Sequence, residues 1–282
     1  MPRSCGATGG DCLLHRADSL AYTAAARLAP CWAAMAPRIF AVLVIALLAL
    51  AGTWALRAGW LAIPDRYNLW AELAPLETSD LLTPMKLRRA QQSPARCLAL
   101  LHESGAQFEP VPDRVTGEGC ALANAVRLRG AAQAPLRTPV LASCRVALSF
   151  AMWERHVLQP AAEASLGTRI ARIDHLGGYA CRDVVNGRRP PEGGAGRRSR
   201  HALADALDIA AFTRADGGAP VVVRGDWTPD GDAGAAAEQQ AAFLRAAHQG
   251  ACSFFDGVLG PDYNAVHADH FHFEVGGWRS CR

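Results

Sequence analysis

The sequence predicts an α+β domain in which helices pack around a small, mostly antiparallel sheet, preceded by one N-terminal transmembrane helix. An uncharged run of eighteen residues, 39–56, lies near the N-terminus. Beyond residue 80, segments with helical spacing of apolar residues are separate from segments with alternating spacing and turn signals. Half of the 282 residues are apolar, which is enough for a sizeable core, and a net charge of +3 does not indicate a nucleic-acid partner.

The run 39–56 predicts a membrane anchor, because about 20 apolar residues cross a bilayer. A buried core helix would show a polar stripe, which this run lacks. A cleaved signal peptide is the closer alternative because small residues follow in AGTWA, although the run is long for one. Arginines before the run outnumber those close after it, which predicts an inner-membrane anchor with the C-terminal domain in the periplasm: Arg3, Arg16, Arg27 and Arg38 against Arg57 and Arg66.

The chain is therefore expected to divide into four parts: a cytoplasmic segment 1–38, the anchor 39–56, a linker 57–80 and a domain 81–282. The residues before Met35 have no clear period, and MAPRIFAVLV is a typical beginning for an anchored bacterial protein. We expect translation to start at Met35. Finding residues 1–34 in the intact mass of the native protein would contradict this expectation.

Cysteine usage agrees with export. An even number of cysteines follows the anchor, and in an oxidising compartment six cysteines predict up to three disulfides with fifteen possible connectivities: Cys97, Cys120, Cys144, Cys181, Cys252 and Cys281. Buried free thiols are the alternative. No CxxC pair occurs, which argues against a structural zinc knuckle.

The first half of the domain predicts helices around short strands. Thr83 is an expected N-cap with Pro84 at the first helical position, and the segment to residue 104 forms one helix or two joined at Pro94. Residues 105–138 are rich in Gly and Pro and predict loops and short strands. Residues 144–167 predict a helix, because apolar residues recur at helical spacing and Pro160 is the first helix breaker.

The second half of the domain changes period. TRIARIDHLGG alternates and predicts a strand, and ALDIAAFTRADGGAPVVV predicts two strands joined by a turn at residues 216–218. AAAEQQAAFLRAAHQGAC predicts a helix that ends near Gly250.

The stretch HADHFHFE, 267–274, crowds three histidines into six positions. A period of two places His270, His272 and Glu274 on one side of a strand, with Phe271, Phe273 and Val275 on the other. Histidine is the commonest metal ligand. A half-buried strand with surface histidines is the ordinary interpretation, but a cluster of three favours a metal site.

Further candidate ligands lie upstream. His201 precedes Asp208, which interrupts the apolar run ALDIAAF, where an unpaired carboxylate would carry a heavy desolvation cost. A cation would offset that cost; a salt bridge to an arginine is the alternative. A catalytic zinc site takes three protein ligands and leaves one position open.

These residues resemble a known family. His201, Ala206 and Asp208 fit H-x-x-G-x-A-x-D, and His270-Phe271-His272 fits the H-x-H motif, of lysostaphin and D-alanyl-D-alanine type zinc metallopeptidases. More closely, the segment from about Thr83 to His272 resembles the extensin-like C-terminal domain of bacterial exported proteins. That resemblance depends on GGYACR, SRHALADALDIAAF, FFDGVLGPDYNAVHADHFHFE and the scattered cysteines. Ala204 departs from the motif, which has glycine there.

The resemblance implies a role for each matching residue. His201, Asp208 and His272 are the expected Zn²⁺ ligands. His270 and Asp269 are the expected catalytic acid or base, and His267 is a further imidazole beside the ligands. Arg182, in GGYACR, is expected to hold substrate or stabilise developing charge. Alanine at position 204 would be strained if that position needs positive φ.

The expected function is hydrolysis of peptide bonds in peptidoglycan stem peptides or cross-links by an exported, membrane-anchored zinc metallopeptidase-like protein. The alternative is a non-catalytic module of the same fold that binds cell-wall peptide, with a structural or vestigial zinc site. The expected partners are peptidoglycan peptide and the membrane, and no nucleic acid.

Overall fold

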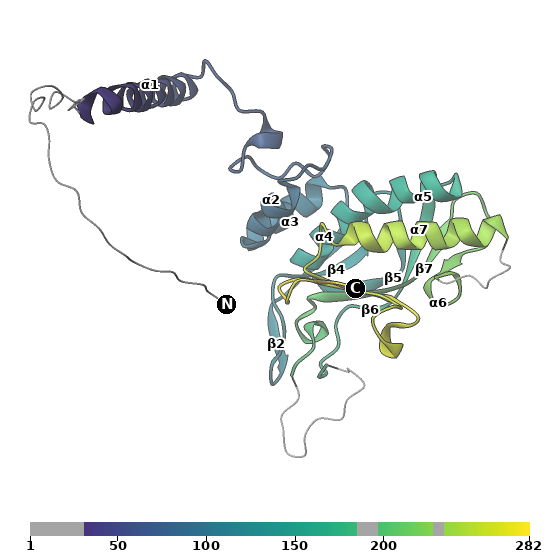
Figure 1. Ribbon diagram of the computed structural model, residues 1–282. Coiled ribbons are helices and arrows are strands. Elements are labelled where there is room, and N and C mark those ends of the chain that lie inside the picture. Colours follow the sequence, from purple (N-terminus) through teal and green to yellow (C-terminus); the bar gives the residue numbers. More distant parts are fainter. Residues whose placement is uncertain (1–30, 185–196, 228–233) are drawn as a thin grey trace, which may run out of the picture. The chain divides into compact units, whose positions relative to one another are not determined.

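The computed structural model (Figure 1) describes residues 31–184, 197–227 and 234–282, without side chains for 31–36. Expectations about residues 1–30 lie outside this range. The described residues divide into two units, one up to residue 62 and one from residue 63 to residue 282. The buried hydrophobic core runs from Leu73 to Val275 and belongs wholly to the second unit. That unit therefore has a core of its own, and we expect it to fold without the first.

The first unit contains one described helix, α1 (Cys31–Arg57). Its portion Pro37–Arg57 is long and apolar enough to cross a membrane, with a mean hydropathy of 2.6, and none of it is buried. The expected apolar N-terminal helix is confirmed.

The second unit begins with a strap, which we define as residues 63–82, followed by two helices. The strap contains the short 3-10 turn η1 (Asp65–Tyr67). Helices α2 (Thr83–Gln91) and α3 (Pro94–Glu103) are separate, because Pro94 opens the second one and the Ser93 side chain accepts from the Arg96 backbone. The N-cap expectation for Thr83 is wrong. Leu82 occupies that position, and Asp80 accepts from the backbone N–H groups of Leu82 and Thr83.

The central sheet of the described residues has nine strands in the order β1-β4-β5-β6-β7-β10-β9-β11, with β8 also paired to β7. A separate hairpin is formed by β2 (Arg114–Gly117) and β3 (Cys120–Leu122). The strands of the central sheet are β1 (Gln107–Val111), β4 (Ala125–Gly130), β5 (Pro135–Ser143), β6 (Ile170–Gly177), β7 (Ala206–Arg214), β8 (Val221–Val222), β9 (Gly257–Leu259), β10 (Phe271–Glu274) and β11 (Ser280–Cys281).

The fold class is confirmed, but the sheet is neither small nor mostly antiparallel. It is mixed, because β5 pairs parallel to β6 and β11 pairs parallel to β9. A parallel neighbour requires a crossover, and the helical segment 144–166 supplies it between β5 and β6. The predicted strands at 170–177 and 206–222 are present.

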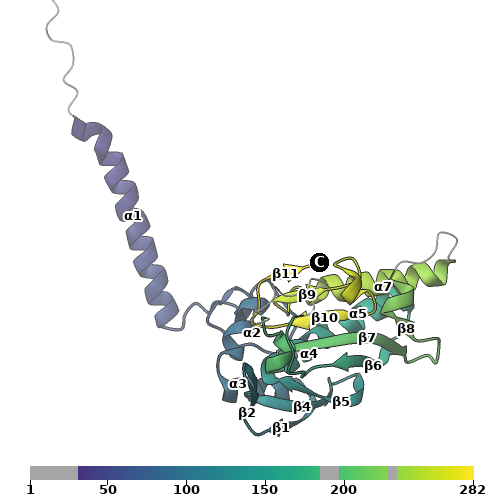
Figure 2. The ribbon, with the colours of Figure 1, turned by 90° about the horizontal axis from the view of Figure 1, so that it is seen from below.

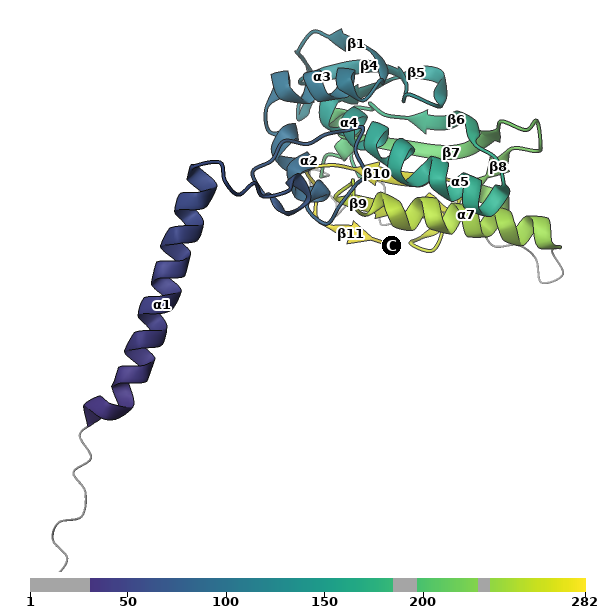
Figure 3. The ribbon, with the colours of Figure 1, turned by 90° about the horizontal axis from the view of Figure 1, so that it is seen from above.

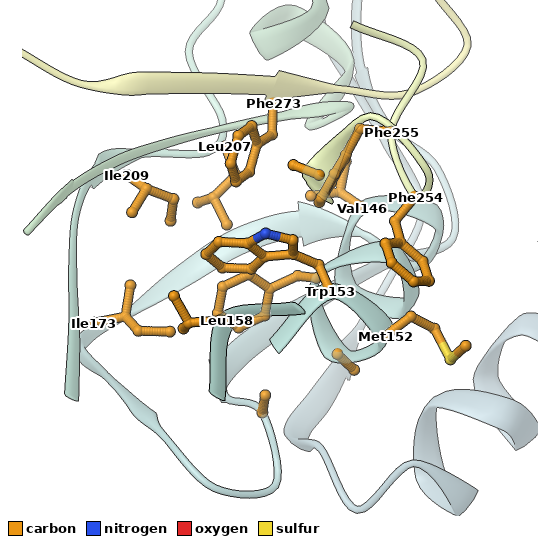
Figure 4. Packing of buried hydrophobic residues seen from close by; sticks show 14 of the residues in the cluster. Val146, Met152, Trp153, Leu158, Ile173, Leu207, Ile209, Phe254, Phe255 and Phe273 are labelled. Carbon is orange, nitrogen blue, oxygen red and sulfur yellow. The ribbon is translucent and has the colours of Figure 1, made fainter. Parts of the chain in front are cut away.

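Helices cover one face of this sheet (Figures 2 and 3). The predicted helix at 144–167 consists of α4 (Cys144–Trp153), a π-helical turn (Glu154–Leu158) and α5 (Gln159–Leu166). Beside it lies α7 (Ala235–Ala251), and the short α6 (Val223–Asp226) follows β8. Trp153 lies between helices and sheet (Figure 4): its indole donates to the Ala247 carbonyl, and its ring contacts Phe273 edge-on.

Three disulfides close the second unit: Cys97–Cys144, Cys120–Cys181 and Cys252–Cys281. The pairing assigns all six predicted cysteines. Cys120–Cys181 joins the β2–β3 hairpin to the segment after β6, which carries Arg182.

Thiol chemistry provides a first test. A 63–282 fragment isolated from an oxidising compartment should contain no more than a trace of free thiol, and reduction should lower its melting temperature. Each native disulfide lost from a domain costs roughly 2–5 kcal/mol. Six thiols titrated in the folded fragment would contradict the pairing.

Glu154 provides a second test, because it is fully buried in the π-helical turn and its Oε2 has no hydrogen-bond partner. Burial raises its pKa above the ordinary value. Stability from this group is therefore fully present below the unfolded-chain pKa and declines as pH rises toward the folded pKa. Glu154→Gln keeps an acceptor for the Gln159 amide, which now lies 2.7 Å from Oε1.

We expect Glu154→Gln to raise the free energy of unfolding, measured in urea at neutral pH, by roughly 1 kcal/mol. The decline in stability as the pH rises above the ordinary glutamate pKa should be smaller in the variant. Glu163→Gln, on the exposed side of α5, is the matched control. Equal pH slopes for wild type and Glu154→Gln would contradict the prediction.

Candidate metal centre

Two predicted ligands are neighbours on adjacent strands of the sheet. In the antiparallel pairing of β10 with β7, His272 lies directly opposite Asp208. The alternation predicted for HADHFHFE is confirmed: Phe271, Phe273 and Val275 are buried in the core, while His270, His272 and Glu274 line a cleft. The sheet register therefore brings a carboxylate and an imidazole together although 64 residues separate them.

The third predicted ligand, His201, comes from a 3-10 turn, η3 (Arg200–Leu203), just before β7. The turn ends at Ala204 in the left-handed conformation, with φ of 55°. This is the position where the motif has glycine, and the alanine accepts the positive φ at a cost of about 1–2 kcal/mol. The chain reverses there, so His201 and Asp208 face the same cleft.

The three side chains are buried and converge on one point. His201 Nε2 lies 3.2 Å from His272 Nδ1 and 3.2 Å from Asp208 Oδ2, and His272 Nδ1 lies 2.9 Å from Asp208 Oδ1. Zinc bonds to nitrogen and oxygen of about 2.0–2.1 Å in a tetrahedron give ligand separations of about 3.3 Å. The observed separations therefore match three corners of a zinc tetrahedron.

Hydrogen bonds on the outer sides of both rings decide which nitrogens face inward without a proton. His201 Nδ1 lies 2.7 Å from the Gly178 carbonyl, and His272 Nε2 lies 3.1 Å from Glu274 Oε2. Each of these acceptors requires an N–H, so in the neutral rings His201 Nε2 and His272 Nδ1 carry lone pairs. Two lone pairs and a carboxylate pointing at one another repel unless a cation or a proton lies between them.

The pKa values of these groups also indicate that the cluster favours a positive charge. Burial raises the pKa of Asp208, but hydrogen bonds from His201 and His272 outweigh this and hold the pKa well below its usual range. Burial disfavours the charged form of His272, yet Asp208 and Glu274 raise its pKa to about 9. The carboxylates therefore favour positive charge at this point, as a metal ion would supply.

Gly178 and Glu274 hydrogen-bond the rings of the two predicted histidine ligands, and the sequence analysis gave neither of them a role. A Cβ atom at position 178 would lie 2.3 Å from the Leu141 carbonyl oxygen. Only glycine therefore fits here and lets its own carbonyl, that of Gly178, reach His201 Nδ1. The glycine pair of GGYACR was the available signal. Glu274 was placed on the histidine face, two residues after His272, but the analysis did not pair the two.

His270 and Asp269 form a second pair beside the three ligands. His270 Nδ1 lies 2.8 Å from Asp269 Oδ1, and its Nε2 lies 3.7 Å from Asp208 Oδ1. Asp269 precedes β10, which begins at Phe271, so the side-chain alternation of a strand does not apply to it. Its carboxylate is half-exposed and orients the His270 ring.

His267 and Arg182 also line the cleft. The His267 Nδ1 lies 2.7 Å from Asn264 Oδ1, and its ring lies 5.3 Å from that of His270. Burial, together with the neighbouring His272 and His270, lowers the pKa of His267 to about 4. His267 is therefore neutral at physiological pH, and its Nε2 is free of the Asn264 contact.

The cleft around these groups has a volume of about 530 Å³. Its polar wall includes four arginines, and its apolar rim consists of exposed side chains: Arg182, Arg197, Arg198 and Arg200, and Val184, Leu203, Tyr263, Val266 and Trp278. The three predicted ligands and both imidazoles of the HADH segment therefore share one opening of a size that accepts a peptide.

Glu274 is testable as the residue that orients His272. Glu274→Gln should weaken Zn²⁺ binding roughly 10–100-fold, because an amide in place of the carboxylate reduces the basicity of the imidazole. Glu274→Ala should weaken it at least as much. Competition with a fluorescent chelator measures the affinity. Glu238→Gln, on α7, is the control; unchanged zinc affinity in both Glu274 variants would contradict the assignment.

Comparison with known proteins gives one match. The model of the family described as "Extensin-like protein C-terminus" matches residues 95–282. The comparisons with curated proteins and with solved structures found no match.

Proposed function

The chain belongs to the extensin-like protein C-terminus family, and from this premise we propose that it is an exported, membrane-anchored zinc metallopeptidase-like protein. Its proposed substrates are peptidoglycan stem peptides or their cross-links. The helix Pro37–Arg57 is the proposed anchor, with the second unit in the periplasm. The arginine bias across the helix and the three disulfides of the second unit support this orientation.

One observation carries the proposal: two imidazole nitrogens and a carboxylate, all buried, converge at separations of 2.9–3.2 Å within an open cleft. A structural zinc site is closed by four protein ligands, whereas a catalytic site has three and an open position. Among the described residues the cluster contains three ligands. The donor set thus favours catalysis over a purely structural role.

The residues of this chain supply the remaining parts of a hydrolytic site. Bound zinc would supply Lewis-acid chemistry, polarising a peptide carbonyl and lowering the pKa of water beside it. His270, oriented by Asp269, accepts a proton from the attacking water and delivers it to the departing amine. Arg182 lines the same cleft and binds a substrate carboxylate or the developing oxyanion.

The cleft chemistry fits cell-wall peptides. These peptides carry free carboxylates, for which the arginine wall is complementary, and they are abundant in the compartment that the proposed topology gives to the domain. Zinc and peptidoglycan peptide are therefore the proposed ligands.

Incubation of purified muropeptides with the 63–282 fragment, followed by chromatography, tests the proposal. Release of shorter peptides that stops with a chelator and returns with added Zn²⁺ is the expected result. Tight binding without any product, with and without zinc, would refute the enzyme and favour a binding module of the same fold. The His270→Ala variant controls for a contaminating hydrolase.

A further inference from the structure

Most exposed large apolar side chains of the second unit lie in two places, the cleft and the segment 63–85. Among its described residues, five line the metal cleft, three lie elsewhere, and seven lie between Ile63 and Met85: Ile63, Tyr67, Leu69, Trp70, Leu76, Leu81 and Met85. Exposed apolar side chains that are concentrated in one segment indicate an interaction surface, whereas single scattered ones do not. The cleft accounts for the first group, and the strap carries most of the last.

Hydrogen bonds fix the backbone of the strap to the domain at residues 65 and 69–71, next to the exposed side chains of Tyr67, Leu69 and Trp70. The half-buried Arg89 guanidinium donates to the carbonyls of Leu69, Trp70 and Ala71 at 2.7, 3.1 and 2.5 Å. The buried Lys86 ammonium donates to the Asp65 carbonyl at 2.7 Å. Cations bind the carbonyl side of the segment, while Tyr67 is 65% and Trp70 79% exposed. One buried and one half-buried cation therefore hold the backbone of a segment whose two aromatic rings are exposed.

Chain connectivity identifies the occupant. The strap begins six residues after Arg57, the last residue of α1, and six extended residues span at most about 20 Å. Any bilayer that holds α1 therefore lies within reach of the strap. Tyr and Trp are the residues that favour the bilayer interface, where the ring is buried and its polar group stays hydrated. Arg66 lies over the Tyr67 ring at 4.9 Å and is exposed, as a side chain facing lipid headgroups would be.

We propose that the exposed side chains of Ile63, Tyr67, Leu69 and Trp70, which we call the strap edge, insert into the lipid headgroup region and hold the domain against the membrane surface. The local charges do not favour an electrostatic mode, because Asp65 and Glu72 accompany Arg66. Insertion of aromatic and aliphatic side chains is the source of affinity, so binding resists salt.

Flotation with vesicles tests this contact without the anchor. The 63–282 fragment is mixed with vesicles of phosphatidylethanolamine and phosphatidylglycerol and centrifuged through a density gradient. The fragment is expected to float with the vesicles at low and at high salt. Tyr67→Ser/Trp70→Ser should reduce the partition coefficient by about tenfold or more, since a decade corresponds to only about 1.4 kcal/mol.

The matched control is Val115→Ser/Leu176→Ser, which removes two apolar side chains exposed elsewhere, at 84% and 59%. It should float like wild type, and all variants should keep the wild-type melting temperature. A wild-type fragment that stays at the bottom, or a Tyr67/Trp70 variant that floats equally well, overturns the proposal. So does light scattering that shows a wild-type dimer which the Tyr67/Trp70 variant abolishes without any vesicle binding, because the edge then contacts a second copy.

Discussion

His272→Ala is expected to lower Zn²⁺ affinity by more than about 100-fold and to abolish peptide hydrolysis with it. The substitution removes a nitrogen that lies 2.9 Å from Asp208 and 3.2 Å from His201, and two remaining donors make a weak site. Metal analysis after dialysis, together with hydrolysis kinetics, measures both losses. Losses at outer partners of metal ligands are typically 10–100-fold, so a ligand should exceed that range.

Folding must be separated from metal loss in this variant. Without His272, the carboxylates of Asp208 and Glu274 lose a buried partner, which can itself cost several kcal/mol. Near-ultraviolet circular dichroism checks the fold of the variant. Asp208→Asn is a second variant, which removes the negative charge of a proposed metal ligand and keeps the shape of its side chain. His102→Ala, at an exposed position of α3, is the control. One equivalent of zinc retained by His272→Ala would show that His272 is not a ligand.

His270→Ala should give the opposite division of effects. All three proposed ligands stay in place, so zinc content should remain near normal while turnover falls by about 10²–10⁴-fold, the usual contribution of a positioned acid or base. Asp269→Ala should give a smaller loss, roughly 10–100-fold, because it only orients the His270 ring from a half-exposed position.

Comparison of His272→Ala with His270→Ala distinguishes a metal ligand from a catalytic group two positions away in the same segment. Inductively coupled plasma analysis and steady-state kinetics on the three single variants provide the comparison. If His270→Ala loses zinc while His272→Ala keeps it, the roles of the two histidines are reversed. If Asp269→Ala costs more turnover than His270→Ala, the carboxylate is the proton acceptor.

Local periodicity predicted most elements of the fold. Apolar residues recur with a helical period at 144–166 and with a strand period at 170–177 and 206–214. Each run is long enough for helix and strand to be told apart. The π-helical turn in the middle of the helical segment was not predicted, because it changes the spacing over only five residues.

Strand pairing was the part that the sequence could not supply. β5 and β6 become parallel neighbours after the chain has crossed the helical layer, and β9 and β11 do so after it has passed through β10. No pattern within one strand records its neighbour. The expectation of a mostly antiparallel sheet followed from the one visible hairpin, β7–β8, and it missed the two parallel pairs that make the sheet mixed.

The sequence predicted the site residues whose type and position match a motif. It did not predict the residues that belong to the site only through a contact with another side chain. His201, Asp208 and His272 were named from their motif positions, and the structure places their donor atoms together. Asp269 was named only as a catalytic candidate; it lies in the turn before β10, and its contact with His270 was not predicted. Glu274 and Gly178 act through hydrogen bonds to the outer ring nitrogens, which residue spacing does not reveal.

The register of β10 against β7 also bears on the order of folding events. Asp208 and His272 become neighbours only when strands separated by more than 50 residues have paired, and such long-range pairing forms slowly. An ion held by these side chains has little affinity for the chain before that step, so it stabilises the completed sheet and not its precursors. Metal capture would then report the end of folding, and refolding monitored by a zinc-sensitive dye should lag behind the recovery of helical circular dichroism.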